Sequence, residues 1–135
     1  MHKRILIVED SLDTAQTLLY LLRDNGHTVD FAINGYAALV AAERQKPDIV
    51  LLDMGLPDFD GLALIKRLKR TPGLEHTRII AVTGRSSDED EQRAMLAGCS
   101  GFLRKPVDIK VLEAALAAHP AAGPGNGPAP QVPKP

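Results

Sequence analysis

The sequence contains a single cysteine, no excess of charge of either sign and no long hydrophobic run. Cys99 has no second thiol to pair with, so the fold cannot rely on an internal disulfide. The 16 Lys and Arg residues nearly balance the 17 Asp and Glu residues, so net charge gives no reason for binding nucleic acid or an anionic membrane. No apolar segment approaches the roughly 18 residues of a membrane span, and the run Ile5–Val8 is too short for a signal peptide. We expect a soluble, cytoplasmic protein that contacts neither nucleic acid nor membrane directly.

The chain length of 135 residues predicts one domain and leaves a segment of different composition at its end. Residues 120–135 are rich in proline, glycine and alanine and offer almost nothing that a core could bury. We expect a folded domain over residues 1–119 and a flexible tail or linker over residues 120–135. A proline ligand for an SH3-type partner is the less favoured interpretation of this tail.

Apolar, β-branched segments alternate with segments of helical period along residues 1–119. The first and third strand candidates are continuously apolar, which is typical of strands covered on both faces. A strand followed by a helix, five times over, predicts an α/β fold with a parallel sheet between two layers of helices. The predicted strands are Ile5–Val8, Thr28–Ala32, Ile49–Leu52, Arg78–Val82 and Gly101–Leu103.

Helix boundaries are predicted from capping residues and from glycine and proline. Asp60 is a good N-cap for the third helix, and Ser87 can cap the fourth, whose first turn is acidic. Gly26 and Gly98 are placed to end the first and fourth helices. The second helix follows Gly35 and stops before Pro47, the third stops before Pro72, and the fifth spans about Asp108 to Ala118 with Val111, Leu112, Ala115 and Leu116 facing inward.

Polar side chains stand where four of these strands end. Because function in a parallel sheet collects at the carboxyl ends of the strands, we expect these side chains to share one edge. Two carboxylates about 4 Å apart repel by roughly 4 kcal/mol at an effective dielectric near 20, so an acidic cluster there requires a cation. Oxygen ligands favour a hard ion such as Mg²⁺. The strand-end residues are Glu9, Asp10, Asp53, Thr83 and Lys105.

Asp53 closes an apolar run, and the chain then turns at Gly55 and Pro57. A carboxylate at the end of a buried strand indicates contact with water, a metal or a ligand, so we expect Asp53 to be exposed. A carboxylate can attack phosphorus and form an aspartyl phosphate. Lys105 and Thr83 would then neutralise and hydrogen-bond the phosphoryl oxygens, and a carbonyl in the turn, taken as that of Gly55, could complete the shell of the metal.

Four motifs, in this order, resemble the receiver domain of two-component response regulators: Glu9-Asp10, the segment LLDMGLPDFDG around Asp53, VTG at Thr83, and Lys105-Pro106. The resemblance covers about residues 3–119. It implies a flavodoxin-like (βα)5 three-layer sandwich with strand order 2-1-3-4-5. The chain would be a stand-alone receiver of the chemotaxis type, or a part of a larger regulator or hybrid kinase.

The resemblance also implies a role for each site residue. Asp53 would accept a phosphoryl group from a histidine kinase or a histidine phosphotransfer protein. Glu9 and Asp10 would bind Mg²⁺ together with Asp53. Thr83 corresponds to the switch hydroxyl of the family, and Lys105 to the residue that contacts the phosphoryl group.

Further positions follow from the same resemblance. Phe102 stands where many receivers carry a tyrosine that turns inward on activation; it lacks the hydroxyl, and a role as a plain packing residue stays open. Gly55 and Arg85 resemble positions that tune the access of hydrolytic water. The peptide bond before Pro106 is commonly cis in the family. The resemblance implies that the only activity is Mg²⁺-dependent self-phosphorylation and slow autodephosphorylation. It also implies that a downstream protein target binds the face formed by the fourth helix, fifth strand and fifth helix. A homodimer is possible in this family.

Two other classes stay open. A haloacid-dehalogenase-like phosphatase also uses an aspartate nucleophile and Mg²⁺, but Gly55 stands where it typically has a second aspartate. A flavodoxin-like binding module would need a phosphate-cradling loop where this chain has Glu9-Asp10. Asp58 and Asp60 are interpreted as turn and cap residues and Cys99 as a packing residue. The four histidines lack ligand spacing, so we expect no transition-metal site.

Overall fold

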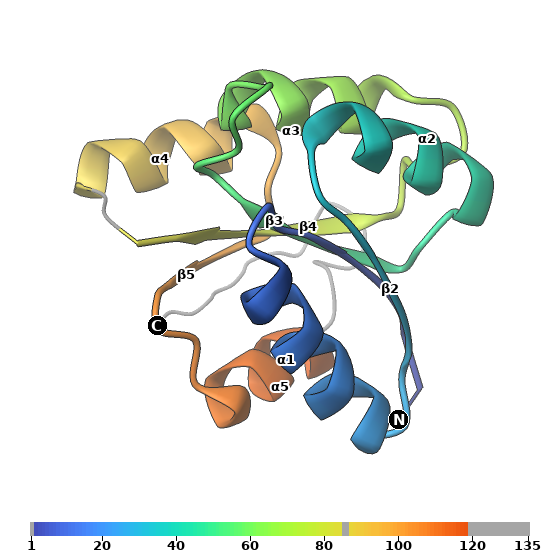
Figure 1. Ribbon diagram of the computed structural model, residues 1–135. Coiled ribbons are helices and arrows are strands. Elements are labelled where there is room, and N and C mark those ends of the chain that lie inside the picture. Colours follow the sequence, from blue (N-terminus) through green and yellow to red (C-terminus); the bar gives the residue numbers. More distant parts are fainter. Residues whose placement is uncertain (1, 85–86, 119–135) are drawn as a thin grey trace.

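Parallel strands and helices alternate along the chain in the computed structural model, which describes residues 2–84 and 87–118 (Figure 1). The strands lie in one sheet in the spatial order β2-β1-β3-β4-β5, as the resemblance implied. All neighbouring strands are parallel, so the polar residues at their carboxyl ends meet at one edge. The strands are β1 (Arg4–Val8), β2 (Thr28–Ala32), β3 (Ile49–Asp53), β4 (Arg78–Thr83) and β5 (Gly101–Arg104).

Helices cover both faces of the sheet (Figure 1). One layer contains α1 (Leu12–Asp24) and α5 (Ile109–Ala117), and the other contains α2 (Gly35–Gln45), α3 (Gly61–Arg70) and α4 (Asp88–Ala97). This arrangement confirms the predicted flavodoxin-like three-layer sandwich. Within the described ranges, none of the helices has the length and apolar character that crossing a bilayer requires.

The sheet separates two apolar cores. Successive strand residues point to opposite faces, so each strand contributes to both. β1 and β3 are apolar on both faces because helices cover both, as their sequences predicted, and β4 is also buried along its whole length. The core under α2, α3 and α4 includes Leu6, Val8, Val50, Leu52, Leu64, Ile65, Leu68, Ile79 and Ala81, and the core under α1 and α5 includes Ile5, Ile7, Leu19, Leu22, Leu51, Ile80, Leu112 and Leu116.

The predicted helix boundaries are largely confirmed by side-chain caps. Asp60 accepts a hydrogen bond from the Ala63 N–H at 3.2 Å and begins α3. Ser87 and Asp90 cap each other's N–H groups at the start of α4, with distances of 3.0 and 3.2 Å. Gly98 ends α4 with φ 122°, a conformation that favours glycine.

Two predictions about burial and length differ from the structure. Val111 was predicted to face inward, but its side chain is 52% exposed. The reason is that Leu112 and Leu116, four positions apart, direct α5 at the sheet, and Val111 is turned about 100° away from Leu112. β3, β4 and β5 each extend one residue beyond the predicted end, so that Asp53, Thr83 and Arg104 belong to the strands themselves.

Arg78 places a buried cation at the start of β4. The residue is 8% exposed, and burial lowers the pKa of its guanidinium. Its Nη1 donates to the Leu116 carbonyl near the end of α5 at 3.5 Å, the outer limit of a hydrogen bond. Its Nε has no hydrogen-bond partner, and Arg78 forms no ion pair with any residue of the described ranges. Arg78 is therefore an incompletely satisfied buried group.

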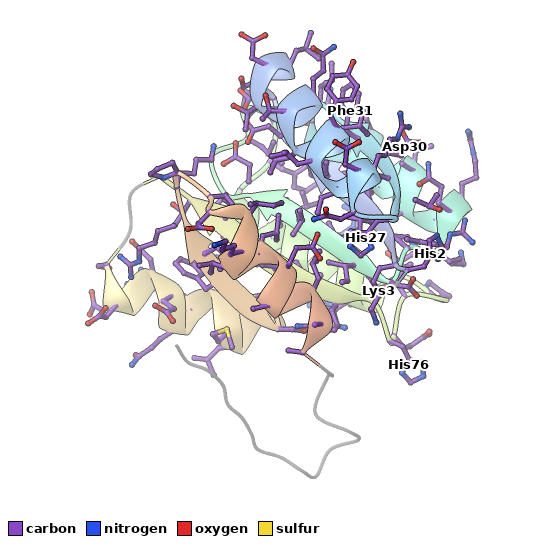
Figure 2. All side chains as sticks on the ribbon, turned by 90° about the horizontal axis from the view of Figure 1, so that it is seen from below. His2, Lys3, His27, Asp30, Phe31 and His76 are labelled. Carbon is purple, nitrogen blue, oxygen red and sulfur yellow. The ribbon has the colours of Figure 1, made fainter. Side chains whose placement is uncertain are left out.

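His27 directly precedes β2, at the amino ends of the strands, and contacts α5. Figure 2 shows it near His2 and Lys3. Its Nδ1 accepts a hydrogen bond from the Lys3 N–H at 3.1 Å, and its Nε2 lies 3.2 Å from Glu113 of α5. Asn25, just after α1, donates to the other Glu113 oxygen at 2.8 Å. Both ring nitrogens of the buried His27 therefore have a partner, which gives this histidine a structural role.

Candidate functional site

Three carboxylates meet where β1 and β3 end side by side. Val8 is in register with Leu52, so Glu9 and Asp10 lie next to Asp53. One oxygen from each of these three residues lies within 4.8 Å of the others. Among the described residues this is the one group of three or more acids, histidines or cysteines close enough to hold a metal ion. The structure thus brings together the acids that the sequence predicted.

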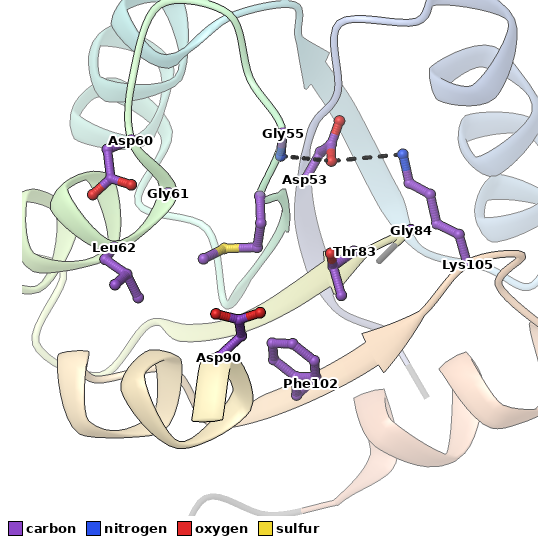
Figure 3. A pocket seen from close by; sticks show the side chains of 11 residues that line it. Asp53, Gly55, Asp60, Gly61, Leu62, Thr83, Gly84, Asp90, Phe102 and Lys105 are labelled. Atoms are coloured by element: carbon purple, nitrogen blue, oxygen red, sulfur yellow. Dashed lines mark hydrogen bonds and ion pairs between the residues drawn. The ribbon is translucent and has the colours of Figure 1, made fainter. Parts of the chain in front are cut away.

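Lys105 supplies positive charge to this cluster from the loop after β5. Its Nζ lies 3.2 Å from Glu9 Oε1 and 3.6 Å from Asp53 Oδ1. Figure 3 shows the lysine reaching across the strand ends toward Asp53. The peptide bond between Lys105 and Pro106 is cis, as the resemblance implied.

The burial of these residues corrects one prediction. Asp53 was expected to be exposed, but it is 7% exposed, and Glu9 is 4% exposed. The reason is that β3 lies between β1 and β4 and includes Asp53 in its ladder with Val82. Asp10, the next residue after Glu9, is exposed. The cluster therefore contains two buried acids, Glu9 and Asp53, and one exposed acid, Asp10.

Burial and neighbouring charge shift the pKa of two groups in the cluster. Burial raises the pKa of the Glu9 carboxyl, and the charge of Asp53 raises it further, against the Ser11 N–H and Lys105, which lower it. Burial alone would lower the pKa of Lys105, but its contacts with Glu9 and Asp53 outweigh burial and raise it. Lys105 is consequently protonated at neutral pH and lies beside two buried acids.

The turn after β3 orients the Asp53 carboxylate. The Gly55 N–H donates to Asp53 Oδ1 at 3.0 Å, and the same oxygen faces Lys105. Gly55 lines the same pocket as Asp53. Its carbonyl stays a predicted metal ligand.

A pocket of about 690 Å³ extends from Asp53 between the N-termini of α3 and α4 toward β5 (Figure 3). Thr83, at the end of β4, lines it and is 8% exposed. Phe102 points into the same pocket from β5, and the Arg104 guanidinium lies 5.9 Å from the centre of its ring. The predicted phosphoryl acceptor Asp53, the predicted switch residue Thr83 and the predicted switch aromatic Phe102 thus line the same pocket.

Two residues contribute more than the sequence indicated. Ser11 donates its N–H to Glu9 Oε2 at 3.2 Å and caps α1, a position that a serine directly after an acidic pair could have suggested. Asp58, interpreted as a turn residue, caps α2 by accepting from the Gly35 and Tyr36 N–H groups at 2.8 and 3.1 Å. These hydrogen bonds lower the pKa of Asp58. No local signal connects Asp58 with residues so distant in the sequence.

The remaining sequence predictions are placed as follows. Asp60 caps α3, as expected, and Cys99 is 5% exposed in the core under α4. His2, His27 and His76 form no metal cluster in the part of the chain that the structure describes. Arg85 and His119, like the tail at 120–135, lie outside the described residues.

Comparisons with known proteins agree with this geometry. The sequence matches the response regulator receiver domain family over residues 5–117. The polar-differentiation response regulator DivK of Brucella anthropi is 34% identical over 109 residues, which cover 81% of this chain and 89% of that protein. The structure is similar to that of the chemotaxis protein CheY4 of Vibrio cholerae, with a TM-score of 0.81 and 28% identity over 86% of this chain and 97% of the other.

A third relative carries a modified acid. The structure of a response regulator from Burkholderia pseudomallei, with a phosphorylated aspartic acid, a calcium ion and citrate, is similar with a TM-score of 0.79 and 31% identity, over 84% of this chain and 66% of that chain. From its sequence, its fold and the relatives that it matches, the chain belongs to the response regulator receiver domains of two-component signalling.

Proposed function

We propose that the protein receives a phosphoryl group on Asp53 from the phosphohistidine of a histidine kinase or a histidine phosphotransfer protein, and signals by a change of its surface. The observation that carries this proposal is the meeting of three carboxylates with Lys105 at the ends of β1 and β3. This arrangement supplies a nucleophile, oxygen ligands for a cation and a fixed positive charge beside them.

The transfer requires one new bond at Asp53. A carboxylate oxygen attacks phosphorus, the phosphorus–nitrogen bond to the donor histidine breaks, and the leaving imidazole keeps the electron pair and takes up a proton. Oδ1 is engaged by Gly55 and Lys105, whereas Oδ2 accepts no hydrogen bond from the described residues and is left for attack. Lys105, 3.6 Å from Oδ1, is close enough to pair with a phosphoryl oxygen after transfer.

The acid cluster fits Mg²⁺. Its donors are all oxygens, they lie within 4.8 Å of one another, and Asp10 keeps the cluster open to solvent. Glu9, Asp10 and Asp53 would hold the ion, with the Gly55 carbonyl as a further ligand. When bound, Mg²⁺ would offset the negative charge of the acids and of the phosphoryl group as it is transferred.

Thr83 and Phe102 carry the proposed switch. A phosphoryl group on Asp53 adds charge and acceptor oxygens to a pocket that Thr83 also lines. A shift of the Thr83 hydroxyl toward those oxygens would change the space beside Phe102 and so bias two arrangements of β4, α4 and β5. The changed face of α4, β5 and α5 is the proposed surface for a downstream protein or a second copy of the chain.

The proposed chemistry is stoichiometric and does not amount to enzymatic turnover of an external substrate. Each transfer modifies Asp53 once, and the acyl phosphate is then lost slowly to water. The phosphorylated aspartic acid of the Burkholderia pseudomallei relative supports this chemistry for a similar fold. We further propose that the protein works in the cytoplasm, where such kinases present their phosphohistidines.

Incubation with acetyl phosphate and Mg²⁺ tests the proposal. We expect the intact mass to rise by one phosphoryl group, and Asp53→Asn to remove this gain. Asp24→Asn, which alters an exposed acid at the end of α1, is the matched control and should be labelled like the wild type. Equal labelling of the Asp53→Asn protein, or labelling that is unchanged by removal of Mg²⁺ with a chelator, would contradict the proposal. Rapid continuous release of phosphate from phosphate esters would favour a phosphatase instead.

A further inference from the structure

Exposed apolar side chains gather on the outer face of α2. Tyr36 is 65% exposed and Val40 is 56% exposed. They stand four positions apart, so they lie on the same face of the helix. Phe59, from the loop before α3, places its ring 5.1 Å from that of Tyr36. These three residues form a continuous apolar patch, here called the α2 patch, and contiguous exposed apolar surface of this kind marks sites of interaction.

Positive charge borders the α2 patch on α3. The Arg67 guanidinium lies 6.0 Å from the centre of the Phe59 ring. α3 also exposes Lys66 and Arg70, and it contains no acidic residue. None of these three cations forms an ion pair with a residue that the structure describes, whereas the acids of α4 pair with Arg93 and Arg104. Lys66, Arg67 and Arg70 are therefore available for ion pairs with a partner.

The α2 patch is tied to the loop that follows Asp53. Asp58 caps α2 through the Gly35 and Tyr36 N–H groups, and Phe59 follows it directly. Phe59 packs so closely on Gly35 that an added Cβ at Gly35 would lie 2.5 to 2.9 Å from its side chain. The position of Phe59, and with it the shape of the patch, thus depends on the loop between Asp53 and α3.

We infer that the α2 patch and the exposed cations of α3 form a docking surface for an acidic protein segment that carries an apolar anchor. The anchor would cover Tyr36, Val40 and Phe59, and carboxylates beside it would pair with Lys66, Arg67 and Arg70. Charge complementarity favours this occupant, since apolar contact supplies affinity and uncompensated cations select acidic partners. α2 lies at the far end of its helix layer from α4, so this surface is separate from the α4–β5–α5 face (Figure 1).

A random peptide library, selected against the unphosphorylated protein, provides the probe. We expect enriched peptides to combine Asp or Glu with aromatic or aliphatic residues and to bind more weakly as salt rises. Tyr36→Ser and Arg67→Glu should each weaken binding of the enriched peptides by about tenfold or more, measured by fluorescence anisotropy. Lys66→Glu gives a second charge reversal on the same surface if Arg67→Glu does not fold.

Matched controls separate the surface from general changes. Tyr20→Ser removes an aromatic ring of similar exposure, 61%, from α1, and Arg4→Glu makes the same charge change at the start of β1. Both should leave peptide affinity unchanged. Failure to enrich acidic peptides, or equal binding by the Tyr36 and Arg67 variants, would overturn the inference. Binding to anionic lipid vesicles would overturn the inference in favour of a membrane as the occupant. Self-association that Arg67→Glu removes would overturn it in favour of a second copy of the chain. The binding test uses no phosphorylation, so its outcome is independent of the proposed transfer to Asp53.

Discussion

Replacing the buried Arg78 by methionine is predicted to stabilise the protein. The orphaned Nε of Arg78 costs about 1–3 kcal/mol, as an unsatisfied buried donor does. Against this, the guanidinium gains roughly 0.3–1 kcal/mol from the carbonyls at the end of α5, since its hydrogen bond to Leu116 is long. Methionine keeps the length and fills the same space with apolar atoms. We expect Arg78→Met to raise the free energy of unfolding by about 1 kcal/mol.

Urea denaturation followed by far-ultraviolet circular dichroism measures this change. For a domain of this size, about 1 kcal/mol corresponds to a rise of the melting temperature by about 4 °C. Arg78→Lys is the matched control, because it keeps a buried cation with fewer directed donors and should lower stability. A loss of more than about 1 kcal/mol in Arg78→Met would refute the reasoning and indicate that the guanidinium has partners, such as ordered water, that satisfy it.

Three further predictions concern packing and the acid cluster. Burial raises the pKa of the Cys99 thiol to about 11, so the stability that the buried thiol contributes is fully present below the ordinary thiol pKa and is lost as the pH rises toward 11. Unfolding measured at increasing alkaline pH should show this loss in the wild type and not in Cys99→Ala. An identical pH profile of the two proteins would contradict this prediction. Gly35→Ala should lower stability by about 1–3 kcal/mol in urea unfolding, because the new Cβ would lie within 2.9 Å of Phe59; an unchanged midpoint would mean that the ring moves freely. Mg²⁺ should raise the melting temperature of the wild type and much less that of Asp53→Asn, since the proposed ion would bind the acid cluster only in the folded protein; an equal rise in both proteins would argue against Asp53 as a ligand.

The strand-end site could be predicted because parallel strands end at the same edge of a sheet, so residues that follow different strands in the sequence lie close together in space. Once Glu9, Asp53 and Thr83 are recognised as the ends of apolar runs, their proximity follows from the direction of the strands. The burial of Asp53 could not be predicted in the same way. The sequence around it shows where the strand stops being apolar, but not that Asp53 itself belongs to the sheet and pairs with Val82 of β4.

Contacts between loops and distant helices were also beyond prediction. Asp58 looks like any aspartate in a turn, and its role depends on α2 beginning beside it. Val111 fits the apolar stripe of α5 as well as Ala115 does, and only the angle at which the helix meets the sheet distinguishes them. Such features are set by packing between elements, which local periodicity does not record.

The division of the interior by the sheet has one further consequence. Each strand sends alternate side chains into two cores that the sheet keeps apart. β5 is a short edge strand with Phe102 packed against the α2–α4 side and the adjacent Leu103 against the α1–α5 side. Because β5 is held in the sheet by β4 alone, a small rotation of this strand would move one side chain in each core at the same time.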